Sequence, residues 1–136
     1  MRKLYLDVDG VLLTTKNTQI AEGIEDFVNY IVTNFDCYWL TTHCKDGSTK
    51  NVLNMLSQYV PNHIAKQLLA VKPTIWNSLK TEAIDFKSDF YWVDDCVFNA
   101  ERQILYNNNC INKLILVDLN NPEELIHVIE KLKEQD

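Results

Sequence analysis

Four short apolar runs constrain the fold of this chain more than any other feature of its sequence. Each run has apolar side chains at nearly every position, so each is suited to a strand with both faces buried, as in a parallel sheet between helices. Stretches with helical periodicity separate the runs, and this alternation is typical of α/β folds. We therefore predict one open, doubly wound (Rossmann-like) α/β domain with helices on both faces of a parallel sheet. The expected strands are Lys3–Val8, Cys37–Leu40, Phe90–Val93 and Lys113–Val117.

The segments between these runs supply the expected helices. Apolar residues from Ile20 to Phe35 recur on one helical face and form the clearest amphipathic pattern. The last helix is expected to begin at Asn121, which is followed by proline and two acids, a common helix start. The segment Pro61–Pro73 shows no readable pattern. The remaining expected helices are Lys50–Gln58, Thr74–Ile84 and Asn99–Tyr106.

The length of the chain, 136 residues, suits a single domain spanning 1–136. Apolar residues make up 46% and charged residues 24%, which excludes wholesale disorder. We find no apolar run long enough to span a membrane and no signal-peptide core. The four cysteines form no C-x-x-C pair and no metal-type spacing. Together these features favour a cytoplasmic protein with reduced thiols.

Polar residues follow the first three apolar runs directly. Asp7 and Asp9 come at the end of the first run, Thr41 follows the second, and Asp94 and Asp95 follow the third. The carboxyl ends of parallel strands meet at one edge of the sheet, where sites form. Clustered carboxylates repel one another unless a cation neutralises them, and Mg²⁺ prefers oxygen ligands. We therefore predict a magnesium site here, with a threonine hydroxyl and a lysine suited to a phosphate dianion.

The residues at the strand ends resemble, in order, the motifs of the haloacid dehalogenase (HAD) superfamily. Asp7-Val8-Asp9-Gly10-Val11-Leu12 looks like the first motif, and Leu40-Thr41 looks like the second. Lys80 is similar to the lysine of the third motif, and Val93-Asp94-Asp95 to the acidic fourth. The expected strands and helices that follow also fit, so the resemblance covers essentially the whole chain.

This resemblance implies a Mg²⁺-dependent phosphatase that acts on a phosphomonoester. Asp7 would be the nucleophile, forming an aspartyl-phosphate, and also a Mg²⁺ ligand. Asp9 would be the general acid and base, with its backbone carbonyl on the metal. Thr41 would hydrogen-bond the phosphoryl group, and Lys80 would stabilise charge around it. Asp94 would bind Mg²⁺ directly, and Asp95 directly or through water.

Several assignments have rivals within the sequence. Thr42 competes with Thr41 as the functional hydroxyl, and Lys72 and Lys87 compete with Lys80. The stretch Thr14-Thr15-Lys16 corresponds to the flap of the HAD family, and it would either contact substrate or form a polar loop. His43 is expected to border the site.

The segments after the first and second motifs leave no room for a large cap domain, so the site should be open. An open site admits a bulky or macromolecular phosphorylated substrate, or needs a partner as its lid. The net charge of −6 argues against a broad nucleic-acid or anionic-membrane surface. Four of the acids belong to the expected site, however, so the remaining surface is nearly balanced. The sequence does not indicate the oligomeric state.

Other functions remain open at this point. A regulatory domain could keep the fold and the metal without turnover. A faint likeness to small HAD domains of RNA repair suggests a polynucleotide-end phosphatase. A phospho-accepting receiver domain also uses aspartate and Mg²⁺, but its lysine comes last in the chain, whereas Lys80 precedes the final acidic pair.

Overall fold

A four-stranded parallel sheet forms the centre of the protein. The computed structural model describes residues 1–134, and the strands lie in the order β2-β1-β3-β4. Every pairing is parallel, as predicted, and β1 lies between β2 and β3. Each strand overlaps one of the predicted apolar runs: β1 is Lys3–Leu6, β2 is Asp36–Trp39, β3 is Phe90–Asp94 and β4 is Leu114–Leu116.

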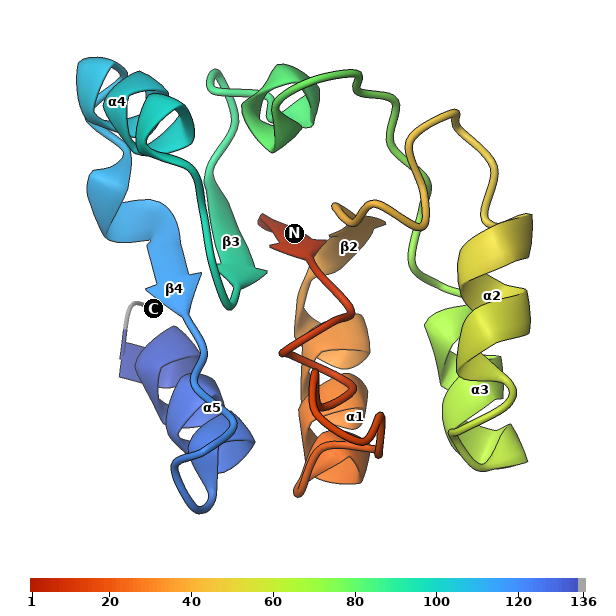
Figure 1. The fold of residues 1–136 in the computed structure, drawn as a ribbon. Coiled ribbons are helices and arrows are strands. Elements are labelled where there is room, and N and C mark those ends of the chain that lie inside the picture. The colour runs from red at the N-terminus through yellow and green to blue at the C-terminus, as the bar shows by residue number, and fades with distance from the viewer. Residues whose placement is uncertain (135–136) are drawn as a thin grey trace.

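Helices cover both faces of this sheet (Figure 1). One layer contains α1 (Ile24–Asn34), α2 (Lys50–Leu56), α3 (Asn62–Leu68) and α5 (Glu124–Glu134), with α1 packed against α3 and α5. The opposite layer contains α4 (Asn99–Asn107) and the short 3₁₀ helix η1 (Lys80–Ala83). A second 3₁₀ turn, η2 (Ile111–Lys113), precedes β4. The α/β class is therefore confirmed.

Two apolar clusters explain why the strands are hydrophobic on both faces. Leu4 and Leu6 of β1 pack with the layer that contains α1, whereas Tyr5 packs with the layer that contains α4. All five residues of β3 are buried. At about 25 cal/mol per Å² of apolar surface removed from water, this two-sided burial is the main force that holds the sheet between its helices. None of the helices in residues 1–134 has the length and hydropathy that crossing a bilayer requires.

The structure corrects two of the helix predictions. Thr74–Ile84 is not a helix, because only Lys80–Ala83 forms a single 3₁₀ turn. The side chain of Glu82 accepts hydrogen bonds from the backbone N–H groups of Asn77, Ser78 and Leu79, which holds these residues in a turn.

The other correction concerns the start of the last helix. The last helix begins at Glu124 instead of Asn121, because Glu123 has a φ of 57°, which a helix cannot accommodate. The segment Pro61–Pro73, which showed no pattern, contains α3.

Candidate active site

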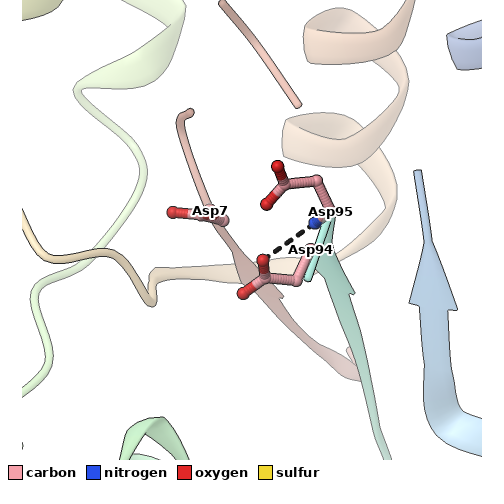
Figure 2. A group of neighbouring side chains, drawn as sticks. All are labelled: Asp7, Asp94 and Asp95. Carbon is pink, nitrogen blue, oxygen red and sulfur yellow. Dashed lines mark hydrogen bonds between the residues drawn. The ribbon is translucent and has the colours of Figure 1, made fainter. Parts of the chain in front are cut away.

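Three aspartates meet where β1 and β3 end (Figure 2). Asp94 is the last residue of β3, Asp95 follows it, and Asp7 comes directly after β1. The backbone N–H of Asp7 donates to the carbonyl of Val93 at 3.1 Å, which extends the pairing of the two strands to their tips. One carboxylate oxygen from each aspartate lies within 4.8 Å of the others. The structure thus brings together three of the four predicted acids.

Asp94 is the most enclosed of the three, with no exposed surface. Its Oδ2 accepts hydrogen bonds from Lys80 Nζ at 2.7 Å and from the indole Nε1 of Trp92 at 3.1 Å. Its Oδ1 accepts the backbone N–H groups of Asp95 and Cys96, at 2.8 and 3.2 Å. Buried carboxylates need such donors to offset their lost hydration. These contacts fix the orientation of Asp94 beneath the other two acids.

Lys80 lies between two of the aspartates. Its Nζ is 2.7 Å from Asp94 and 3.4 Å from Asp7. Burial opposes the charge of this ammonium, but the charges of Asp7 and Asp94 outweigh burial, so the pKa of Lys80 is raised. The rival lysine, Lys72, instead forms an exposed ion pair with Asp36 at 2.8 Å. The lysine that reaches the cluster is therefore Lys80.

The carboxylates of the cluster are costly to ionise together. Burial, followed by the charge of Asp94, raises the pKa of Asp7 to about 8. Burial, followed by a hydrogen bond with Asp94 and its charge, raises the pKa of Asp95 to about 6. When all three acids are ionised, they and Lys80 carry a net charge of −2, which one divalent cation would balance. Because the donors are all carboxylate oxygens, the group fits Mg²⁺.

Asp9, the fourth predicted acid, does not bring its carboxylate into this group. Its side chain is half exposed, and its Oδ2 lies 2.8 Å from Nε2 of His43. The assignment of the Asp9 carbonyl to the metal stays a prediction. Sequence reasoning placed His43 at the border of the site but missed this contact. A histidine and an aspartate just beyond neighbouring strands are the signal that could have revealed it.

Thr41 is fully buried beyond the tip of β2, whereas Thr42 is exposed. The N–H of Leu40 donates to the carbonyl of Leu6, so Thr41 follows a residue that is paired with β1. The hydroxyl oxygen of Thr41 accepts the N–H of His43 at 3.3 Å. Its own proton has no acceptor among residues 1–134, and it is therefore available to a ligand oxygen.

Gly10 joins the acid cluster to a neighbouring pocket. Its φ of 82° lies in the region that favours glycine, and a Cβ at this position would collide with the carboxylate of Asp95. Gly10 and Asp95 both line a pocket of about 520 Å³. The pocket is lined by the loop after β1, by Asp95 and by the end of β4 with the loop that follows it: Gly10, Thr14, Thr15, Lys16, Asp95, Leu116, Val117, Asp118, Leu119 and Asn120.

The loop that carries Thr14, Thr15 and Lys16 is held by its own hydrogen bonds. The Thr14 hydroxyl donates to the carbonyl of Lys16 and accepts the N–H of Gln19, both at 2.9 Å. The ammonium of Lys16 has no partner among the described residues. This loop therefore presents a free cation to the pocket beside the acid cluster.

Comparison of the chain with protein-family models, with curated proteins and with solved structures found no match. The functional argument therefore rests on the geometry of the site.

Proposed function

We propose that the protein is a Mg²⁺-dependent phosphomonoester phosphatase of the HAD type, with Asp7 as its nucleophile. The observation that supports this most is the group of buried Asp7, buried Asp94 and half-buried Asp95, with Lys80 in contact with two of its members. A nucleophilic carboxylate, a place for a hard cation and a fixed ammonium are the parts that phosphoryl transfer needs.

The residues of the cluster fit a magnesium ion. Asp7, Asp94 and Asp95 would hold it with carboxylate oxygens, and the HAD resemblance adds the backbone carbonyl of Asp9. When bound, Mg²⁺ would neutralise charge on the phosphoryl oxygens. Lys80 would hold its charge beside the same oxygens, and Thr41 would donate its unpaired hydroxyl proton to one of them.

The reaction would take place in two steps. First, a carboxylate oxygen of Asp7 attacks phosphorus, and the bond from phosphorus to the ester oxygen breaks. Asp9 donates its proton to the departing oxygen, so an alcohol leaves and an aspartyl-phosphate remains. Second, Asp9 accepts a proton from water as that water attacks phosphorus. This step releases inorganic phosphate, regenerates the Asp7 carboxylate and returns the proton to Asp9.

The pocket beside Asp95 is the place for the alcohol part of the substrate. Its volume is within the usual range of small-molecule sites, and Lys16 would attract an additional negative charge on the substrate. Its lining contains no aromatic residue on which a nucleobase could stack. A small polar phosphomonoester therefore suits it better than a polynucleotide end.

Hydrolysis of an aryl phosphate by the purified protein tests this function. We expect turnover with Mg²⁺, none after chelation by EDTA, and a fall in kcat of at least about 10³-fold in Asp7→Asn. Glu130→Gln removes one exposed negative charge on α5 and should keep the wild-type rate. If metal-replete wild-type protein hydrolyses no member of a broad phosphomonoester panel, the proposal is wrong.

A metal- and phosphate-binding domain without turnover is the second candidate. The contact between Asp9 and His43 favours it, because it keeps the acid and base outside the three-aspartate group. In this case beryllofluoride with Mg²⁺ would raise the unfolding temperature of the wild type, although no phosphomonoester is hydrolysed. Turnover of the aryl phosphate would exclude this second candidate.

A further inference from the structure

Glu101 is a buried carboxylate to which neither the metal nor the phosphoryl chemistry assigns a role. It lies in the first turn of α4 and is only 2% exposed. It forms no ion pair with any residue in 1–134. Burying an unpaired carboxylate is unfavourable unless hydrogen bonds compensate for the lost water. The partners of Glu101 therefore indicate what the residue does.

Both oxygens of Glu101 bind backbone N–H groups, and the two groups belong to different segments. Oε2 accepts the N–H of Lys80 at 2.7 Å. Oε1 accepts the N–H of Phe98 at 2.8 Å, just before α4 begins. One side chain thus ties the segment that carries the site lysine to the segment that follows Asp94 and Asp95.

The backbone at Lys80 depends on such a hydrogen bond from another element, because few hydrogen bonds within its own short turn hold it in place. Lys80 begins η1, a single 3₁₀ turn, and the residue before it is extended. Short 3₁₀ turns have poor hydrogen-bond geometry and depend on their surroundings. Glu82 binds the three preceding N–H groups, but it is exposed and lies within the same loop. Glu101 is a buried residue of another element, and it holds this loop through the backbone of Lys80.

We propose that Glu101 is a positioning residue that fixes Lys80 for phosphoryl transfer. The inference rests on the proposed function, in which Lys80 stabilises the transferred group. Glu101 holds the backbone of Lys80, while Asp94 and Asp7 hold its ammonium. The long lysine side chain is therefore fixed at both ends. Loss of the backbone anchor would allow Nζ to move away from Asp7 without removing the ammonium.

Two substitutions weaken this anchor to different degrees. Glu101→Gln keeps the length of the side chain and one acceptor oxygen, and Glu101→Ala removes both acceptors. We expect kcat for an aryl phosphate to fall about 10- to 100-fold in Glu101→Ala and less in Glu101→Gln, with KM changed less than about twofold. Both rates are compared at equal concentrations of folded protein, so that loss of folded protein alone would not produce this order.

Glu124 supplies a matched control. It is the other buried glutamate, it lies in the first turn of α5, and it accepts the N–H of Asp118 at 2.6 Å. Glu124→Gln should lower the unfolding temperature about as much as Glu101→Gln while leaving kcat within about twofold of the wild type. Because Asp118 lines the proposed substrate pocket, any effect of Glu124→Gln on activity should fall on KM. An equal loss of kcat in the two variants would contradict a specific role for Glu101.

A double-mutant cycle with Lys80→Met decides the inference. If Glu101 acts through Lys80, then adding Glu101→Gln to Lys80→Met should lower kcat by less than about twofold further. Losses that multiply in full would show that Glu101 acts independently of Lys80, and this would overturn the inference while the phosphatase function stands. A wild-type protein without any turnover would instead refute the proposed function, and this inference with it.

Discussion

Replacing the proposed nucleophile should stabilise the metal-free protein. In Asp7→Asn, a buried carboxylate becomes a neutral amide of the same size. The wild-type carboxylate is 6% exposed and faces Asp94 and Asp95, so its ionised form is disfavoured in the fold. The asparagine lacks this charge and leaves Lys80 paired with Asp94.

The pKa of Asp7 sets the size and the pH dependence of this gain. Its pKa rises from 3.8 to about 8 on folding, because of burial and then the charge of Asp94. The protonated form of Asp7 therefore contributes its full stabilisation to the folded state below pH 3.8. This contribution to the free energy of unfolding is lost as the pH rises toward 8. At about 1.4 kcal/mol per pH unit, the loss at pH 7 is on the order of 4 kcal/mol. Asp7→Asn avoids this loss, but burying its amide costs roughly 1–3 kcal/mol, so we expect a net stabilisation of about 1–3 kcal/mol.

Thermal unfolding in EDTA, followed at several pH values, measures the effect. For a chain of this length, a net gain of 1–3 kcal/mol corresponds to a rise of roughly 3–10 °C in Tm. The advantage of Asp7→Asn should grow between pH 5 and pH 8, whereas Glu130→Gln should follow the wild type. Added Mg²⁺ should raise the Tm of the wild type and not that of Asp7→Asn. A variant that is less stable than the wild type at pH 8 in EDTA would refute the electrostatic reasoning.

Two further substitutions test the geometry of the site. Gly10→Ala places a side chain against Asp95 at a positive φ, so it should cost about 1–2 kcal/mol from the backbone alone and should weaken Mg²⁺ binding at least about tenfold. Urea denaturation and calorimetric titration measure the two effects, and unchanged Mg²⁺ affinity would contradict the contact with Asp95. Lys80→Met should lower kcat about 10²-fold or more, whereas Lys72→Met should keep the wild-type rate; equal rates in the two variants would show that the wrong lysine is assigned.

Much of the fold could be predicted from the sequence because the strands bury both faces. In a run such as Phe90–Val93 every residue is apolar and buried, so the strand can be recognised from the run itself. The polar residues just beyond the run mark where the strand ends. The segment Thr74–Ile84 was predicted wrongly because its apolar spacing resembles that of a helix. There the side chain of Glu82 outcompetes the helical hydrogen bonds by binding the N–H groups of the preceding turn. Periodicity does not detect such a local competition.

The site was predictable to the extent that its residues follow strands directly. Asp7 and Asp94 meet because their strands are neighbours and in parallel register. The alternating pattern implied the parallel sheet, but not which strands are neighbours. Glu101 was not predictable as a site residue, because an acid in the first turn of a helix is usually only a favourable end charge. Its role depends on a loop that approaches from elsewhere in the chain, and this approach leaves no local pattern.

The central position of β1 also bears on how the protein folds. Leu6 pairs with both Trp39 and Val93, so the edge that carries Asp7 is complete only when the distant β3 has docked. Contacts between segments far apart in sequence are slow to form. A cation held by Asp7 and Asp94 would therefore find its full set of ligands only after this docking. It would lengthen the lifetime of the native state by slowing unfolding, and it would leave the rate of refolding almost unchanged.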